Sequence, residues 1–366
     1  MQSRPHPKFY MPGEWLFKSS TLQSQPHARF YMPAEWSNHS HTLMVWPDSA
    51  SIPWPYHEAI HSARYEVSAI ANAISHFQPV TMYARPHNVS RAKDTVSERV
   101  TVCPLEAWHL WVRDTGPTFV QNISDGSPTG LSMNFNYWGA KLPREGDDGV
   151  VSRILSRMDV PVITAPFKAE GGAIEVDGEG TLLATESAIL NANRNPGISK
   201  EAVEEHFRKF LGVKKTIWFR GVKGHDIADY HIDAFARFLS PGVVLLSRPP
   251  KTAQEILRAA YEQAREVIQQ ETDAQGRHLE VVELAEPPTE VLAGDHYGNT
   301  VASYANYLLV NGGVIMPRFG VGEEDLDAFE LFRRRFPGRE VVQIYLNTLP
   351  KLGGGIHSAT QQVPLR

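Results

Sequence analysis

Charged side chains lie next to turn residues in four short stretches of this chain, and these are the places where it can carry chemistry. In one of them His231 and Asp233 are two residues apart, so on a strand both side chains would point to the same side. A carboxylate and an imidazole on one face can hold a cation and move a proton. The four stretches are Trp111–Pro117, Glu170–Ala173, Gly224–Asp233 and Gly353–Gln362.

The last of these stretches begins with three consecutive glycines and continues through His357, Ser358 and Thr360. Glycine adopts backbone angles that other residues resist, so such a run can bend tightly and approach a ligand closely. A run of glycines and small polar residues is not needed to form a hydrophobic core. We therefore predict a loop that places the side chain of Ser358 against a bound molecule.

Each stretch also has a structural interpretation, which the residues alone leave open. Arg113 and Asp114, ahead of Gly-Pro, can stabilise a turn, and Glu170 followed by two glycines is a common turn sequence. His231 and Asp233 can be half of a metal site, but no cysteine lies near them and the other histidines are scattered along the chain. We predict no metal site and no cofactor.

The composition excludes several classes of function. The 366 residues are 42% hydrophobic and carry a formal net charge of −5, so neither nucleic acid nor an anionic membrane is an expected partner. The single cysteine, Cys103, excludes an intrachain disulfide framework and a cysteine-based zinc site. No apolar run reaches the roughly 18 residues of a membrane span, and the N-terminus lacks a hydrophobic signal core. We expect a cytoplasmic protein.

A repeat marks the start of the chain. Residues 5–15 recur as residues 26–36, with eight of eleven positions identical. The second copy leads directly into the first strand pattern, at 42–46. We therefore interpret residues 1–24 as a duplicated, poorly ordered extension and residues 25–366 as one domain.

Beyond the repeat, helical and extended patterns alternate along the chain. Apolar residues at helical spacing predict helices at 56–77, 148–158, 251–270 and 323–336, and Ser199 is a good N-cap for one more. Strands are expected between them, among others at 79–84, 109–113, 118–120 and 232–239. Five helices, each followed by strands, predict a single α/β domain of about five units. Alternation alone fits a doubly wound sheet equally well.

Taken together and in this order, the stretches resemble the agmatine deiminase and bacterial-type peptidylarginine deiminase family of the guanidine-modifying superfamily. The resemblance runs from residue 26 to residue 366, and it implies a five-bladed, pseudo-fivefold α/β propeller with a central active site. The matching segments read MPAEW (32–36), WVRDTGPTFV (111–120), NFNYWG (134–139), EGGAIEVDGEGTLLATESAILNANRNPG (170–197), GHDIADYHIDAFARF (224–238), SYANYLLVNGGVIMPRFG (303–320) and GGGIHSATQQVP (353–364).

The resemblance assigns the binding of the substrate to four side chains. Asp114 and Asp233 match the aspartates that clamp a guanidinium, a planar cation that carboxylates bind in bidentate fashion. Trp111 matches an aromatic residue beside the cation, where a ring face attracts positive charge. Asn306 matches a polar residue near the attacking group. The implied partner is a small guanidino compound, and a homodimer is a further implication of the family.

The resemblance also assigns the chemistry, which is hydrolysis of a guanidino group to a ureido group and ammonia through a covalent intermediate. His231 matches the general acid and base, and Glu170 matches the glutamate that supports it and the cation. Ser358 occupies the position of the attacking cysteine. Cys103 is an implausible substitute, because it lies on a predicted strand outside every matching segment.

The serine is the one departure from the family pattern. A thiol reaches the thiolate readily because its pKa is near 8.5, whereas a hydroxyl is far more basic and needs a general base. Three interpretations remain: an engineered change in a competent deiminase, a guanidine-binding pseudoenzyme, and an enzyme that still processes an activated substrate. An amidinotransferase on the same fold is a further alternative. The substrate is open among agmatine, an arginine derivative and arginine in a small peptide.

Overall fold

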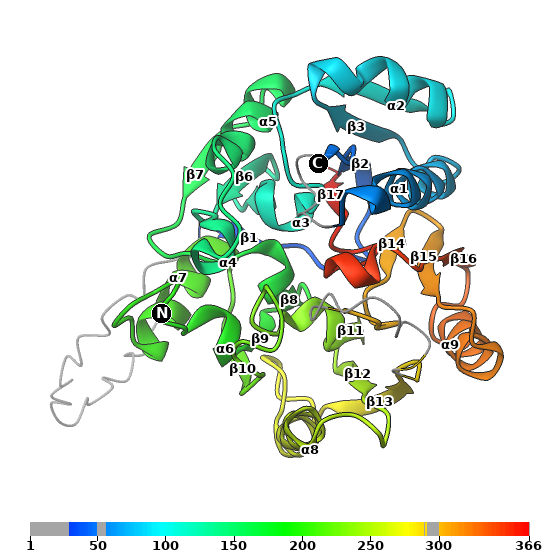
Figure 1. Ribbon diagram of the computed structural model, residues 1–366. Helices are drawn as coiled ribbons and strands as arrows, with labels where there is room; N and C mark the ends of the chain where they lie inside the picture. Colours follow the sequence, from blue (N-terminus) through cyan, green and yellow to red (C-terminus); the bar gives the residue numbers. More distant parts are fainter. Residues whose placement is uncertain (1–28, 50–55, 289, 291–299, 366) are drawn as a thin grey trace, which may run out of the picture.

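The computed structural model describes residues 29–49, 56–288, 290 and 300–365, and within these ranges the strands form five separate sheets. The predicted extension at residues 1–24 lies outside the described residues. Figure 1 shows the sheets around a common centre with the long helices on the outside. The five units predicted from the alternation are confirmed, and the arrangement is that of an α/β propeller rather than one doubly wound sheet.

One pattern recurs in all five sheets. Two neighbouring strands pair antiparallel, and the second of them pairs parallel with a third strand that follows a long helix. A parallel connection needs such a crossover, whereas an antiparallel pair needs only a turn. The Asp-Gly, Pro-Gly and Asn-Gly pairs of the sequence supply three of these turns, at 177–178, 241–242 and 311–312.

The first two units have four strands each. The first unit, whose sheet has the strand order β17-β2-β3-β4, comprises β2 (His39–Val45), α1 (Ile60–Ile74), β3 (Val80–Ala84), α2 (Val89–Thr95), β4 (Val100–Pro104) and β17 (Thr360–Pro364). The second unit, whose sheet has the strand order β1-β5-β6-β7, comprises β1 (Phe30–Tyr31), α3 (Val112–Thr115), β5 (Thr118–Asn122), β6 (Pro128–Ser132), α4 (Tyr137–Ala140), α5 (Val150–Met158) and β7 (Val162–Thr164).

The other three units have three strands each. The third comprises β8 (Ile174–Val176), β9 (Thr181–Thr185), α6 (Glu186–Ile189), α7 (Lys200–Leu211) and β10 (Lys215–Phe219). The fourth comprises β11 (Ala236–Ser240), β12 (Val243–Arg248), α8 (Glu255–Gln270) and β13 (Glu280–Ala285). The fifth comprises β14 (Leu308–Val310), β15 (Gly313–Arg318), α9 (Gly322–Arg335) and β16 (Glu340–Tyr345).

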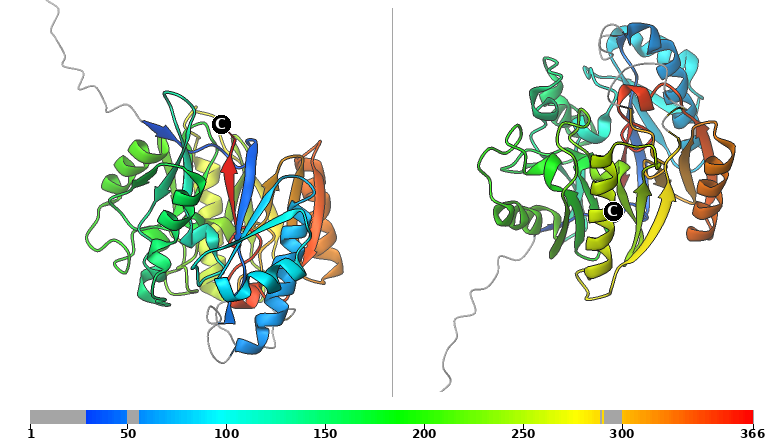
Figure 2. Two further views of the ribbon diagram at one scale, coloured as in Figure 1. Left: turned by 90° about the horizontal axis from the view of Figure 1, so that it is seen from above. Right: turned by 60° about the horizontal axis from the view of Figure 1, so that its bottom comes forward.

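The ring is closed by the two ends of the chain. The C-terminal β17 pairs antiparallel with β2, with Thr360 opposite Met44, and Figure 2 shows the red strand beside the blue one. Ser358 lies two residues before this strand. Because β17 begins at Thr360, its pairing with β2 fixes the position of the glycine loop that carries Ser358.

Local sequence signals set the ends of α7. The hydroxyl of Ser199 accepts a hydrogen bond from the backbone N–H of Ala202 at 3.2 Å, as predicted for an N-cap, which stabilises a helix by about 1 kcal/mol. Gly212 ends the helix with φ 70°, a left-handed conformation that glycine adopts without strain. In the described ranges, no helix is long and apolar enough to cross a membrane.

Two predicted strands are wrong where they reach the centre of the ring. Residues 112–115 form the single-turn helix α3, and residues 232–234 form the 3-10 turn η6 (Ile232–Ala234), so that β11 begins only at Ala236. In both places the apolar residues that suggest a strand have no partner strand to pair with. An unpaired extended segment leaves its backbone groups unsatisfied, and a tight turn satisfies them locally. His231 and Asp233 therefore do not share the face of a strand.

Candidate active site

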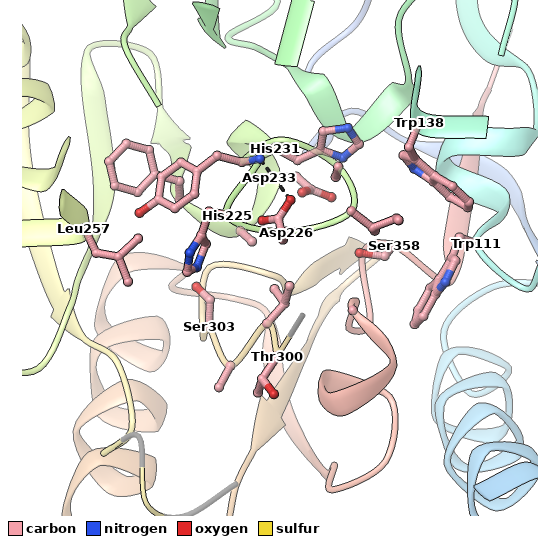
Figure 3. Close-up of a pocket in the computed structure, with 18 of the residues that line it drawn as sticks. Trp111, Trp138, His225, Asp226, His231, Asp233, Leu257, Thr300, Ser303 and Ser358 are labelled. Carbon is pink, nitrogen blue, oxygen red and sulfur yellow. Dashed lines mark hydrogen bonds between the residues drawn. The ribbon is translucent and has the colours of Figure 1, made fainter. Parts of the chain in front are cut away.

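A cavity lies at the centre of the molecule (Figure 3). Five of the seven predicted site residues line it: Trp111, Asp114, His231, Asp233 and Ser358. The other two, Glu170 and Asn306, do not line the cavity but contact residues that do: Glu170 contacts His231, and Asn306 contacts Ser358. The structure thus brings together all seven residues from stretches that are far apart in the sequence.

Asp114 is held in place by two donors. The indole N–H of Trp138 donates to Oδ2 at 2.8 Å, and the backbone N–H of Gly172 donates to Oδ1 at 3.1 Å. Trp138 has φ 54°, an uncommon conformation for a bulky residue, and this conformation accompanies the contact of its ring with the carboxylate. Burial raises the pKa of Asp114, and the neighbouring Glu170 and Asp233 raise it further against the opposing effect of His231.

His231 lies between two carboxylates. Its Nε2 is 3.2 Å from Oε2 of Glu170, and its Nδ1 is 3.8 Å from Oδ2 of Asp114. Burial alone would lower the pKa of His231, but the charges of Asp114, Glu170 and Asp233 together raise it to about 9. This raised pKa favours the imidazolium at neutral pH, so the ring can act as a proton donor.

Glu170 is anchored from the side opposite His231. The Nε of Arg194 donates to both carboxylate oxygens at 2.8 and 3.0 Å, and Nη1 of the same arginine contacts Asp229 at 2.7 Å. Burial would raise the pKa of Glu170, but His231 and Arg194 hold it below its usual value. Glu170 stays ionised and supports the charge of the imidazolium.

Asp233 is linked to the loop that carries Ser358. Its Oδ2 is 2.8 Å from Nδ1 of His357, and Nε2 of that ring is 2.8 Å from Oε2 of Glu35. Arg237 also contacts Glu35, at 3.1 Å. Burial would raise the pKa of Asp233, but His357 and then His231 and Arg237 lower it. The lowered pKa favours the carboxylate form of Asp233.

These groups converge on the backbone at Gly172. A Cβ atom built on Gly172 would lie 2.6 Å from Nδ1 of His231, 3.0 Å from Oδ1 of Asp114 and 3.1 Å from Oδ2 of Asp233, so no other residue fits there without displacing them. Glycine thus lets two carboxylates and an imidazole come together at the cavity, where they match the edge of a small planar cation.

Ser358 is placed by hydrogen bonds from its own loop and its neighbours. Its backbone N–H and its Oγ both lie 3.4 Å from Oδ1 of Asn306, and its carbonyl accepts from the backbone N–H of Arg113 at 3.2 Å. Gly354 lets the loop pass over Trp111, because a Cβ there would lie 2.6 Å from the ring. Among the described residues, the amide oxygen of Asn306 is the one hydrogen-bond partner of the Ser358 hydroxyl, so no base contacts it.

Several functional residues were missed from the sequence. Trp138 and Glu35 lie in segments that the resemblance covers, but nothing local shows that one holds Asp114 and the other His357. Gly172 was seen as part of a turn, although its missing side chain is what lets His231, Asp114 and Asp233 lie so close to the backbone. The predicted absence of a metal stays a prediction; within the described ranges no group of three or more His, Cys, Asp and Glu is disposed to hold one.

Comparisons with known proteins agree with this geometry. The model of the Porphyromonas-type peptidyl-arginine deiminase family matches residues 31–364. The agmatine deiminase of Stutzerimonas stutzeri is 36% identical, over 97% of this chain and 95% of its own, and that of Pseudomonas aeruginosa is 35% identical, over 88% and 92%. The solved agmatine deiminase of Enterococcus faecalis superposes with a TM-score of 0.83 at 29% identity, covering 92% of this chain and 96% of its own. The chain therefore belongs to the Porphyromonas-type peptidyl-arginine deiminase family, and it is a hydrolase of the deiminase type that acts on guanidino C–N bonds.

Proposed function

We propose that the enzyme binds the guanidinium of a small guanidino compound in the central cavity, between Asp114 and Asp233. The convergence of both carboxylates and of His231 at the cavity is the observation that carries this proposal. Trp111 closes the cavity from the loop side, and its ring face suits a delocalised cation. Relatives named agmatine deiminase make agmatine the first compound to test.

The proposed reaction replaces one guanidinium nitrogen by oxygen. The hydroxyl oxygen of Ser358 bonds to the central carbon, the C–N bond to the departing nitrogen breaks, and the His231 imidazolium protonates that nitrogen as ammonia. The ammonia takes up the proton that the Ser358 hydroxyl loses and leaves as ammonium. The neutral His231 then takes one proton from water as the water oxygen bonds to the same carbon, and the other proton of that water passes to the Ser358 oxygen as its bond to the carbon breaks. The products are a ureido compound and ammonium, and Asp114 and Asp233 hold the rest of the group throughout.

Ser358 makes the first step slow. The oxygen of a hydroxyl must lose its proton to a base, and the described neighbours of Ser358 supply an amide oxygen rather than a base. The carboxylates of the clamp also disfavour an alkoxide, since like charges repel. We therefore propose strong guanidine binding with little turnover in the chain as given.

The test is to measure ureido product and ammonia from agmatine with the chain as given and with Ser358→Cys. Turnover by the cysteine form supports the deiminase reaction. Calorimetry with Asp233→Asn, expected to weaken agmatine binding on the order of a hundredfold, and with the exposed control Asp94→Asn, expected to leave it unchanged, tests the clamp. Binding without turnover in the cysteine form would favour a pseudoenzyme, and amidino transfer to added glycine or lysine would favour an amidinotransferase.

We also propose that the enzyme works in the cytoplasm as a homodimer. The single cysteine, Cys103, is half-buried in β4 and unpaired, which suits a reducing compartment. Cell fractionation and light scattering of the purified protein test the two parts of this proposal. Recovery from an extracellular fraction, or a monomer mass, would contradict the corresponding part.

A further inference from the structure

The segment between β16 and β17 carries Ser358 to the cavity and is held at both of its ends. Its C-terminal end is fixed by Asn306 and Arg113, which contact the backbone of His357 and Ser358. Its N-terminal end, at residues 347–349, lies beside α1 (Figure 1). Among the described residues that line the cavity none belongs to α1, so this second contact acts on the loop from outside the site.

Glu66 of α1 makes this contact with both oxygens of its carboxylate. Oε1 accepts hydrogen bonds from the backbone N–H groups of Asn347 and Thr348 at 2.9 and 2.8 Å, and Oε2 accepts one from that of Leu349 at 2.8 Å. Glu66 is 5% exposed, and within the described ranges it forms no ion pair. A buried carboxylate without a cation depends on such hydrogen bonds, so the three N–H groups are held close to it.

Leu349 connects Glu66 to the glycine run. Its N–H donates to Glu66, and its carbonyl accepts a hydrogen bond from the backbone N–H of Gly354 at 3.2 Å. Gly354 lies against the ring of Trp111, where a Cβ atom would be only 2.6 Å from the ring, and Ser358 lines the cavity four residues later. A shift of Leu349 would therefore move Gly354 and, with it, the start of the turn that holds Ser358.

A carboxylate is unusual in the surroundings of Glu66. The neighbouring positions on the same face of α1 are Ala63, Val67 and Ile70, and all three are apolar and fully buried. An apolar side chain at position 66 would extend this face, but it would leave three N–H groups of the loop without an acceptor. The loop that Glu66 binds, rather than the packing of the helix, thus explains why a carboxylate stands there.

We propose that Glu66 is a positioning residue for Ser358, which fixes the start of the glycine loop and thereby the distance between the attacking side chain and a bound guanidinium. This inference rests on the proposed role of Ser358. Asp114 and Asp233 are held by other side chains, so the clamp does not depend on Glu66. A displacement of about 1 Å at the attacking group can cost about a hundredfold in rate. Glu66 therefore acts on the chemical step and not on the affinity.

The test uses Glu66→Gln in the full chain, on the Ser358→Cys form, whose turnover is measured. Glutamine keeps the size of the side chain, but its amide nitrogen is a donor and cannot accept from the backbone. We expect kcat for agmatine to fall roughly tenfold to a hundredfold and the affinity in calorimetry to stay the same. Asp273→Asn is the matched control, because Asp273 is 2% exposed and accepts from two backbone N–H groups at 2.9 Å, in the turn before β13. This variant should leave both quantities unchanged.

Hydrogen exchange on the chain as given supplies a readout that does not need turnover. In Glu66→Gln the amides of residues 347–358 should exchange about tenfold faster than in the parent chain, whereas Asp273→Asn should leave them unchanged. Faster exchange confined to residues 347–349 would overturn the proposal, because Glu66 would then hold those residues alone. An unchanged kcat in folded Glu66→Gln, or an equal loss in Glu66→Gln and Asp273→Asn, would overturn it as well.

The two readouts separate this proposal from the one on which it rests. If Ser358→Cys releases no ammonia, the proposed function fails, and hydrogen exchange still decides whether Glu66 positions residue 358. Thermal melting checks that each variant is folded. If Glu66→Gln does not fold, Glu66→Asp takes its place, because it keeps the charge and shortens the reach of the carboxylate. The same loss of kcat and the same faster exchange are expected, and their absence would overturn the proposal.

Discussion

Nδ1 of His357 lies 2.8 Å from Oδ2 of Asp233, so the residue next to Ser358 in the sequence holds one arm of the guanidinium clamp. The other nitrogen of the ring is 2.8 Å from Glu35. The loop that presents Ser358 to the cavity therefore also fixes the direction of the Asp233 carboxylate.

Replacement of this imidazole is expected to weaken binding without removing any clamping group. In His357→Gln the side chain cannot reach both carboxylates in the same way, so Asp233 loses a hydrogen bond to a charged group worth about 1.5–3 kcal/mol. We expect agmatine affinity to fall by roughly tenfold to a hundredfold in calorimetry. His76→Gln, at an exposed histidine after α1, should have no effect. Unchanged affinity in His357→Gln would mean that Asp233 is positioned without His357.

Adding a methyl group at Gly172 is expected to abolish binding because it displaces the groups that hold the guanidinium. The Cβ atom of Gly172→Ala would lie 2.6 Å from Nδ1 of His231, 3.0 Å from Oδ1 of Asp114 and 3.1 Å from Oδ2 of Asp233, so these side chains must shift. The variant should show no detectable agmatine binding in calorimetry. Gly322→Ala, where a Cβ meets nothing within 4 Å, is the control and should keep full affinity. Tight binding by folded Gly172→Ala would place the cation elsewhere.

The protonation of His231 is expected to appear in the pH dependence of stability. Its pKa rises from about 6.5 in the unfolded chain to about 9 in the folded one, so its contribution is fully present below pH 6.5 and is lost as the pH rises through 9. This contribution amounts to about 3 kcal/mol at most. Urea unfolding of the parent chain between pH 6 and pH 9.5 should therefore show a decline that His231→Gln lacks. Parallel curves for the two proteins would show that His231 is not an imidazolium in the folded state.

The five units could be predicted because their signals are local. Each long helix has its own apolar spacing, and Ser199 or a glycine-containing turn marks an end without reference to the rest of the chain. The interaction of Glu35, His357 and Asp233 could not be predicted in this way. It joins residues from three parts of the chain, and it exists only because β17 returns to pair with β2.

The two local errors have the same origin. Asp114 and His231 border segments rich in apolar residues, as strands often are, yet those segments lie where the chain turns into the central cavity. A local sequence pattern cannot show whether a partner strand is present. The resemblance to the deiminases nevertheless named residues that the structure brings together, since a motif records the composition of a site even where the conformation around it is mispredicted.

The most direct measurement is the rate of ammonia release from agmatine by Ser358→Cys relative to the chain as given, with binding measured on both. We expect similar affinities and a rate at least a hundredfold higher for the cysteine form, because a thiol ionises far more readily than a hydroxyl at the same position. Equal rates in the two forms, or ammonia release by neither despite tight binding, would contradict the assignment of residue 358 as the attacking group of a deiminase.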